Sequence, residues 1–196
     1  MPFDQLQRFV TSIAPLRDEE WNAFAAAWQP FVCGRKTLLT APGDTERYLY
    51  FVLDGVQRSY FTTAAGREAT LVFTYPVSFS GVADSLLTQT PSAYGFETLT
   101  ASRFLRTSHG QLQSLMQEYP ALQALVLKAT AFALKGVLER MTELQTAGAE
   151  EKFRALMARS PHLLQLVPHK YLASYLALDA STFSKLLGSV RIGGNE

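Results

Sequence analysis

The stretch "RYLYFVLDGVQRSYFTTAAGREATLVFTYP", residues 47–76, holds two runs of aromatic and β-branched residues separated by a short polar segment. Such runs favour β-strands, because these side chains pack well on a pleated surface. Gly66 lies between the runs and can adopt a positive φ without steric cost, so the stretch predicts a β-hairpin. Further short runs bounded by Gly, Pro, Ser or Thr predict a β-sandwich or barrel over residues 30–107.

Helical patterns flank the predicted strands. Apolar residues recur at spacings of three and four over residues 3–28, and again over a long segment at 119–146. The long segment is apolar on two faces, so we expect one face to lie on the barrel and the other on a second copy of the chain. The alternative is a helix that is wholly buried within its own chain. The expected dimerisation residues are Leu122, Leu125, Ala129, Phe132 and Gly136.

The stretch "HKYLASYLALDASTFSKLL", residues 169–187, predicts two short helices joined by a tight corner at residues 177–179. Asp179 can cap the second helix, and Ala177 stands where glycine is commoner. Small polar side chains face outward on the second helix. This is the helix-turn-helix pattern, whose second helix enters the major groove of DNA. The alternative is a helical hairpin that covers a core.

The helix-turn-helix pattern predicts which residues would contact DNA. Phosphate contacts are expected from His169, Lys170 and Arg191. Base contacts are expected from the second helix, at Ala180, Ser181, Ser184 and Lys185, and Thr182 is also expected to contact DNA. Residues 150–196 carry six Lys or Arg against four acidic residues, which is a thin positive charge for a DNA-binding unit.

The composition of the 196-residue chain is that of a globular protein, with 47% apolar and 18% charged residues and a net charge of +1. The single cysteine, Cys33, excludes an intramolecular disulfide and fits a reducing cytoplasm. The N-terminus does not have the pattern of a signal peptide, and Lys128 and Lys135 interrupt the most apolar segment. We therefore expect a cytoplasmic protein without a membrane span.

Enzymatic sites are not expected. His109, His162 and His169 all lie outside residues 30–107, so the barrel lacks the histidines of a cupin metal site. Cys33 alone cannot hold an iron–sulfur cluster. Ser80 does not stand in a nucleophile-elbow motif. The sequence therefore predicts no catalytic residues, metal or cofactor.

The order of elements, together with "YLYFVLDGVQRSYF", "GREATLVF", "FSG", "LTQTPSAYGFETL" and "VPHKYLASYLALDASTFSKL", resembles the Crp/Fnr family of bacterial transcription regulators over nearly the full length. The chain looks most like the short members common in Bacteroidetes. The resemblance implies an α+β fold of N-terminal helices and a double-stranded jelly-roll barrel, a long dimerisation helix and a C-terminal helix-turn-helix domain. It implies a sensor domain at 1–118, a dimerisation helix at 119–147 and a DNA-binding domain at 148–196.

The resemblance also implies where a cyclic nucleotide would bind. The family's phosphate cassette has a glutamate after an F-x-G turn and an arginine before a Ser/Thr-Ala pair. This chain has Val82 and Pro91 at those positions, and a buried phosphate without a cation is costly. We therefore expect no high-affinity binding of cAMP or cGMP.

A pocket in this barrel would suit a neutral or hydrophobic molecule. The expected lining residues are Leu71, Phe79, Ser80, Gly81, Val82, Ser92, Ala93 and Tyr94. The alternative is that side chains simply fill the barrel.

These observations predict a homodimeric transcription regulator of the Crp/Fnr type that binds a palindromic DNA site. The half-sites would lie about one helical turn apart, ~34 Å. A small-molecule effector is not identifiable from the sequence. The alternative function is a small-molecule sensor or interaction module with a degenerate DNA-binding domain.

Overall fold

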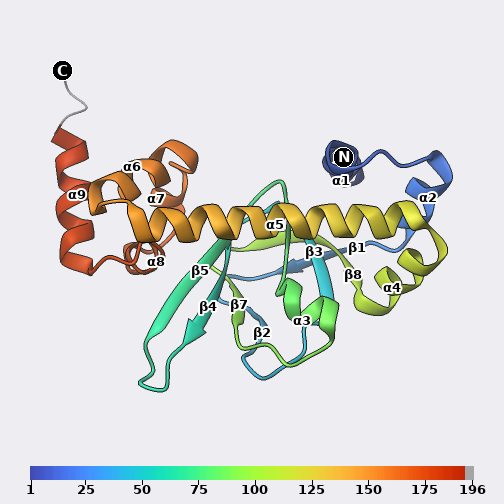
Figure 1. Cartoon of the computed structure of the whole chain (residues 1–196), viewed down its shortest axis with the longest axis horizontal. Coiled ribbons are helices and arrows are strands. Elements are labelled where there is room, and N and C mark those ends of the chain that lie inside the picture. The colour runs from blue at the N-terminus through green and yellow to red at the C-terminus, as the bar shows by residue number, and fades with distance from the viewer. Residues whose placement is uncertain (193–196) are drawn as a thin grey trace.

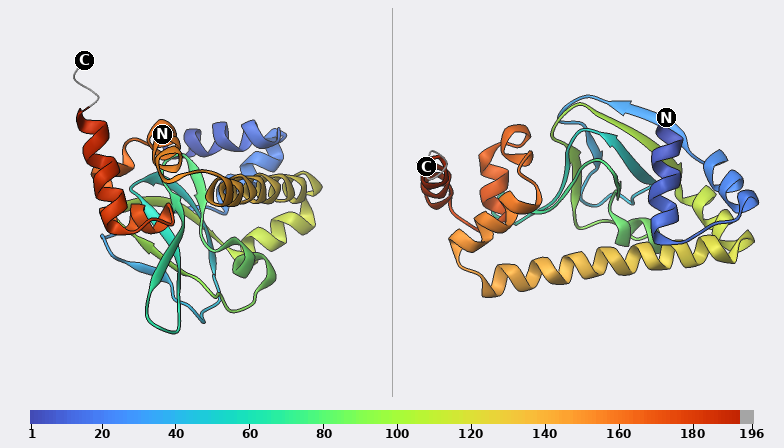
Figure 2. Two further views of the ribbon diagram at one scale, coloured as in Figure 1. Left: turned by 60° about the vertical axis from the view of Figure 1, so that its left-hand side comes forward. Right: turned by 90° about the horizontal axis from the view of Figure 1, so that it is seen from above.

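The computed structural model describes the backbone of residues 1–192 and the side chains of residues 1–189. Its long helix α5 (Pro120–Thr146) runs along the molecule, with the strands on one side of it (Figure 1). Seen from above, the C-terminal helices gather at one end of α5 and the N-terminal helices at the other (Figure 2). The remaining helices are α1 (Pro2–Ile13), α2 (Asp18–Ala26), α3 (Ala83–Thr88), α4 (His109–Glu118), α6 (Ala149–Arg159), α7 (Leu163–Leu166), α8 (His169–Tyr175) and α9 (Ala180–Ile192).

The strands form two antiparallel sheets of four strands each, in the orders β1-β8-β3-β6 and β2-β7-β4-β5. They are β1 (Gln29–Cys33), β2 (Leu38–Thr40), β3 (Tyr48–Asp54), β4 (Gln57–Thr62), β5 (Glu68–Thr74), β6 (Ser78–Ser80), β7 (Gly95–Thr98) and β8 (Ser102–Ser108). The predicted hairpin is β4–β5, and Gly66 in its turn has a φ of +75°. The expected α+β fold with a jelly-roll barrel and a long helix is confirmed.

Strand β3 is buried on both faces, which explains its uninterrupted apolar sequence. Tyr50 and Val52 share the core inside the barrel with Phe104 of β8. Phe51, between them, packs on the other side of the sheet in a core that includes Leu6 of α1. Because successive side chains of a strand point to opposite faces, a strand covered on both faces needs apolar residues at every position.

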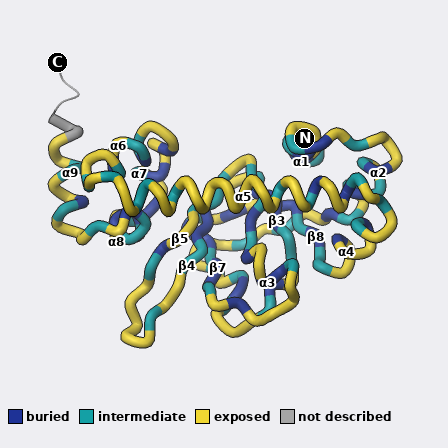
Figure 3. The backbone as a smooth tube through the Cα atoms, in the orientation of Figure 1, coloured by how far each residue is buried: buried dark blue, intermediate teal, exposed yellow. Residues whose placement is uncertain are grey.

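Helix α5 packs against its own chain at its two ends but not in its middle. Leu122 and Leu125 are buried in the core formed with the N-terminal helices. Residues 131–139 are all exposed (Figure 3). Near the other end, the Arg140 side chain donates a hydrogen bond to the Tyr175 carbonyl oxygen. The alternative of a helix wholly buried within its own chain is therefore wrong.

By length and composition alone, α5 is the described helix that could cross a membrane. The sequence analysis did not predict this, because Lys128 and Lys135 interrupt the apolar run. The same composition is expected of a helix whose two apolar faces are each covered by protein.

The C-terminal helices share a core with the barrel. Phe153, Leu172 and Phe183 are fully buried in this core, and Val56 and Leu99 of the barrel belong to the same cluster. The C-terminal helices and the sheets therefore bury apolar surface against each other, which is the main favourable contribution to such an interface.

Helix α8 docks on strand β5 through polar and aromatic contacts. The Ser174 hydroxyl accepts a hydrogen bond from the Thr70 N–H at 3.0 Å and donates to the Glu68 carbonyl oxygen at 3.3 Å. The rings of Phe73 and Tyr175 lie 5.0 Å apart between centroids. A serine on a helix thus bonds to the backbone of a strand, which fixes the position of α8 along β5.

Arg58 of β4 lies at the centre of this interface, with a side chain only 2% exposed. Its Nε donates to Glu97 Oε1 at 2.6 Å, and its Nη2 donates to Glu68 Oε2. The guanidinium carbon lies 4.3 Å from the centre of the Tyr60 ring and 3.7 Å from that of Tyr171 in α8. A buried charge must be paired to be tolerated, and here two carboxylates pair it while α8 covers it.

We expect the Arg58→Met variant to lose about 3–5 kcal/mol in the free energy of unfolding, because Glu97 would keep a charge in a largely buried site without its partner. The matched control is Arg103→Met, since Arg103 pairs with Asp54 at 3.4 Å and both side chains are 62% exposed. The control should lose about 0–1 kcal/mol. Urea denaturation followed by circular dichroism measures both, and equal losses would contradict the assigned role of Arg58.

Candidate functional site

The corner between α8 and α9 requires an unusual backbone conformation. Ala177 has a φ of +52°, in the left-handed region that favours glycine. The Leu178 N–H donates to the Ala173 carbonyl oxygen at 2.9 Å, which closes the end of α8. Ala173 is 3% exposed, so its small side chain permits the close packing of the two helices. The predicted corner at residues 177–179 is present.

Asp179 caps the N-terminus of α9, as predicted. The Thr182 N–H donates to Asp179 Oδ1 at 2.8 Å. The hydroxyls of Ser181 and Thr182 donate to the same carboxylate at 2.6 and 2.8 Å. These hydrogen bonds, with that from the Ser181 hydroxyl the strongest, hold the pKa of Asp179 well below its usual value. The Ser181 and Thr182 hydroxyls are therefore engaged in the cap, which the sequence analysis did not predict.

The outward side of α9 carries most of the residues expected to contact bases. The exposed ones are Ala180, Ser181, Ser184 and Lys185, whereas Thr182 is half-buried. Phe183, on the opposite side, is buried and packs edge-on against Phe153 at 5.5 Å. Arg191 lies in α9 beyond the residues whose side chains the structure describes. The described part of α9 thus presents small polar side chains and one lysine to solvent.

The two other residues expected to contact phosphates lie at the start of α8. His169 and Lys170 are both exposed. The His169 ring lies 5.6 Å from that of Phe183, and the Lys170 Nζ lies 4.8 Å from the centre of the Tyr171 ring. Both side chains are therefore exposed and also lie close to an aromatic ring.

The eight residues expected to line a barrel pocket do not face one cavity, which corrects that expectation. Val82 is buried in the core inside the barrel. Phe79 lies on the other side of the sheet, stacked on Trp28 at 5.9 Å. Leu71 and Ala93 are exposed. These side chains point in different directions because alternate positions on a strand face opposite sides.

The polar members of this set are occupied by local hydrogen bonds. The hydroxyls of Ser80 and Thr74 lie 2.7 Å apart. The Ser92 hydroxyl donates to the Tyr94 carbonyl oxygen at 2.8 Å and accepts from the Tyr94 N–H at 2.9 Å. At Gly81, which has a φ of +120°, a Cβ would lie 3.2 Å from the Tyr48 carbonyl oxygen. Protein atoms therefore fill this part of the barrel.

Glu46, in the turn between β2 and β3, places a buried carboxylate beside the "FSG" turn. It accepts hydrogen bonds from the Thr40 hydroxyl at 2.6 Å and from the Val82 N–H at 3.2 Å. It also accepts from the N–H groups of Arg47 and Tyr48, at 3.0 and 3.2 Å. Four donors satisfy this carboxylate, so its burial does not leave an unpaired charge. The backbone donor after Gly81 is thereby already in use.

The predicted dimer seam on α5 is corrected at two of its five residues. Leu122 and Leu125 are buried in the core of their own chain and cannot contact a second copy in this structure. Ala129 is half-buried on the same side of the helix, while Phe132 and Gly136 are exposed. The sequence could not distinguish the two apolar faces, because both have the same spacing.

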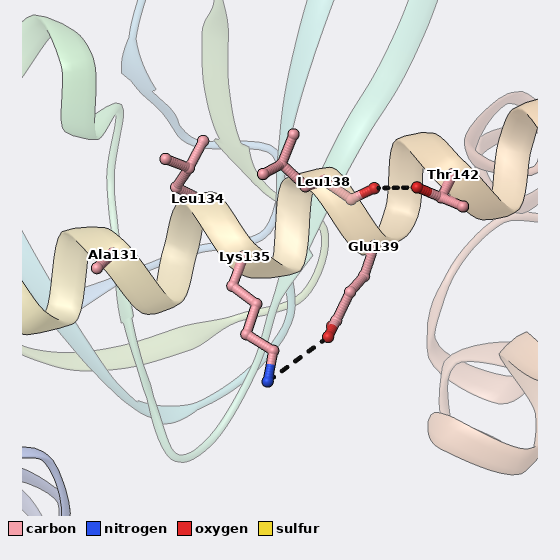
Figure 4. Close-up of a pocket in the computed structure, with 6 residues that line it drawn as sticks. All are labelled: Ala131, Leu134, Lys135, Leu138, Glu139 and Thr142. Carbon is pink, nitrogen blue, oxygen red and sulfur yellow. Dashed lines mark hydrogen bonds and ion pairs between the residues drawn. The ribbon is translucent and has the colours of Figure 1, made fainter.

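An exposed apolar row runs along the opposite side of α5. Leu134 and Leu138 point to the same side, whereas Lys135 and Glu139 point away and form an ion pair at 3.7 Å (Figure 4). The members of this row are Leu127, Ala131, Leu134, Leu138 and Met141. They are spaced alternately by four and three residues, which is the spacing of a coiled-coil seam. The four large side chains are 49–70% exposed, which is unusual for a chain without a partner.

The sequence analysis missed Arg58 and Glu46. Each is a single charged residue, one in a predicted strand and one in a predicted turn, and such residues are exposed as a rule. No motif distinguishes them, because the contacts with Glu97 and Val82 that cover them come from residues 39 and 36 positions away in the chain.

Residues 32–119 match the family model of the cyclic nucleotide-binding domain. A comparison with curated protein sequences finds no significant match. Among solved structures, FixK2 from Bradyrhizobium japonicum is similar with a TM-score of 0.76 at 17% identity, covering 85% of this chain and 86% of that one. The regulator CLP from Xanthomonas campestris has a TM-score of 0.65 at 18% identity, covering 91% and 93%. The Thermus thermophilus catabolite activator protein has a TM-score of 0.57 at 21% identity, covering 93% and 87%.

Identities this low establish the fold and not the ligand or the DNA site. The matched family region spans the barrel and α4, and the structural matches extend over the long helix and the C-terminal helices. Residues 32–119 are therefore similar to the cyclic nucleotide-binding domain, and the chain has the fold of the three solved structures.

Proposed function

We propose that the chain is a homodimeric, cytoplasmic transcription regulator of the Crp/Fnr type without enzymatic activity. In this proposal residues 1–118 form a sensor, 119–147 the dimerisation helix and 148–196 the DNA-binding domain. The observation that carries it is the exposed polar side of α9, with Ser181, Ser184 and Lys185 on a helix capped by Asp179. A short helix of this kind fits the major groove of DNA.

The interface with the barrel supports this role for α9. Ser174 and Tyr171 of α8 are held by β5 and by Arg58, so the inward side of the helix pair is occupied. The outward side of α9 is left free in the described part of the chain. A helix pair that only covered a core would not need an exposed row of small polar side chains.

A second function remains compatible with one observation. Lys185 is the lone cation among the described side chains of α9, and a thin positive charge weakens phosphate binding. The alternative is therefore a small-molecule sensor or interaction module whose helix-turn-helix has lost affinity for DNA. Salt-dependent DNA binding separates the two functions.

Glu46 supports the proposal that the barrel does not respond to cAMP or cGMP. A cyclic phosphate at the "FSG" turn would face the Glu46 carboxylate, which already accepts from the Val82 N–H. Like charges at close range in a buried site repel strongly. Pro91 supplies no compensating cation.

We expect the protein to bind DNA from upstream of its own gene more tightly than unrelated DNA, with half-sites ~34 Å apart. Fluorescence anisotropy at several salt concentrations should show log affinity falling linearly with log salt, with a slope of ~0.9 for each phosphate contact. Equal affinity for both DNAs would favour the alternative function.

The Lys185→Ala variant should lose about 1–3 kcal/mol in binding to the preferred site and less on unrelated DNA, because its side chain would contact a base. Arg8→Ala is the control, since Arg8 is exposed on α1, far from α9, and its loss changes the net charge equally (Figure 1). If Lys185→Ala weakened binding to both DNAs equally, Lys185 would contact a phosphate rather than a base.

We expect the dimer to form through the row Leu127, Ala131, Leu134, Leu138 and Met141. The double variant Leu134→Glu/Leu138→Glu should be monomeric, because it places like charges against each other across a coiled-coil seam. Phe132→Glu is the control, since Phe132 is 57% exposed on the other side of the same helix. Sedimentation velocity measures the oligomeric state of each variant. A monomeric control together with a dimeric double variant would favour the seam that the sequence predicted.

Calorimetric titration with cAMP should give no micromolar binding to the wild-type chain. The physical reason is the buried carboxylate of Glu46 together with the missing cassette arginine. The titration uses the unlabelled wild-type protein, so no variant has to be made. Micromolar affinity would overturn this part of the proposal without affecting DNA binding.

A further inference from the structure

A cavity of about 500 Å³ opens on the barrel, and Phe79, Ser80, Gly81 and Val82 are not among its lining residues. Residues from β1, β2, the following turn, β3 and β8 line it, among them Phe31, Leu39, Tyr48, Tyr50 and Arg106. This volume lies in the range of small-molecule sites. The cavity does not include the eight residues that the sequence predicted for a pocket.

The guanidinium of Arg106 lies between aromatic rings in this cavity. Its carbon is 4.0 Å from the centre of the Phe31 ring and 4.4 Å from that of Tyr48. Its Nε is buried and has no hydrogen-bond partner. The hydrogen bonds and ion pairs of Arg58, by contrast, involve two carboxylates. Within the part of the chain whose side chains are described, no carboxylate lies within ion-pair distance of Arg106.

The other charges at the cavity do not neutralise Arg106. Glu46 is a lining residue, but its carboxylate is already satisfied by four donors. Asp44 and Arg47 are exposed at the rim. A ligand with one negative charge could pair with Arg106, and a dianion such as phosphate would be repelled more strongly by Asp44 and Glu46 than a monoanion would.

The geometry of Arg106 selects a planar acid group. Aromatic rings lie within 4.4 Å of its guanidinium carbon, so the open approach is along the edge that bears the N–H groups. A carboxylate matches that edge with two parallel hydrogen bonds. The rings of Phe31, Tyr48 and Tyr50, with Leu39, form a wall that suits an aromatic body.

Tyr50 offers a second donor to the acid group. Burial raises the pKa of its phenol, and the neighbouring Glu46 carboxylate raises it further. The phenol therefore stays protonated over the physiological pH range and can donate a hydrogen bond.

From this cavity and the unpaired guanidinium we propose that the barrel binds a small aromatic monocarboxylate, with Arg106 as its anchor. The proposal concerns a ligand site and does not depend on DNA binding by α9. The ligand carboxylate would pair with the guanidinium edge, and its ring would contact the aromatic wall.

The test uses benzoate as the probe and benzamide as its uncharged match, both titrated into the full chain and observed by ligand NMR. We expect benzoate to bind and benzamide to bind at least about tenfold more weakly, because benzamide lacks the charge that pairs with Arg106. Inorganic phosphate should not displace benzoate. Absence of benzoate binding at millimolar concentration, or equal binding of benzamide, overturns the proposal without any variant.

Two variants locate the site. Arg106→Met keeps a long side chain between the rings and should weaken benzoate binding at least about tenfold. Arg103→Met removes the same charge from the same strand, at an exposed position outside the cavity, and should leave binding unchanged. Thermal melts of both variants report whether they are folded. A folded Arg106→Met variant that binds benzoate like the wild type, or displacement of benzoate by phosphate, assigns the binding elsewhere and overturns the proposal.

Discussion

A guanidinium that is removed from water needs ion pairs, and protein atoms must shield these pairs from solvent. Arg58 has both its ion pairs and this shielding only while α8 lies against the barrel. Glu97 and Glu68 come from the barrel, but the ring of Tyr171 that closes the site comes from the C-terminal helices. Helix α5 adds to this placement near its end, where the Arg140 side chain donates to the Tyr175 carbonyl oxygen, whereas its residues 131–139 are exposed. The orientation of α9 relative to the sheets therefore rests on the contacts of α8 with β4 and β5, and any event that loosens them would change how α9 is presented.

Three charged residues of the barrel differ in the partners that surround them. Arg58 is paired by carboxylates, and Glu46 is satisfied by four hydrogen-bond donors, so both stabilise the arrangement around them. Arg106 is stacked on aromatic rings, but its Nε lacks a partner. An unpaired buried donor costs free energy. Arg58 and Glu46 therefore have structural roles, whereas Arg106 is free to bind a ligand.

The two faces of α5 differ in how much of their surface the chain itself covers. The face with Leu122 and Leu125 completes the core of the N-terminal part, where it meets the residues of α1. The opposite row from Leu127 to Met141 has coiled-coil spacing, and its four large side chains stay 49–70% exposed. In the proposed dimer a second copy would bury these apolar side chains. A symmetric pair would also place two α9 helices at a fixed separation, as a palindromic DNA site requires.

The sequence by itself determined the elements and their order. Its aromatic and β-branched runs predicted the barrel, its periodicity predicted the helices, and "ALD" predicted the corner at which Ala177 adopts a positive φ and Asp179 caps α9. These features are local, since each depends on neighbours within a few residues. Only the tertiary structure decided which face of α5 is buried, that Glu46 and Arg58 lie inside, and that Arg106 rather than Val82 lines the cavity. Burial of a side chain depends on segments distant in the chain, and no local pattern records which of two equally spaced faces, or which of many charged residues, those segments will cover.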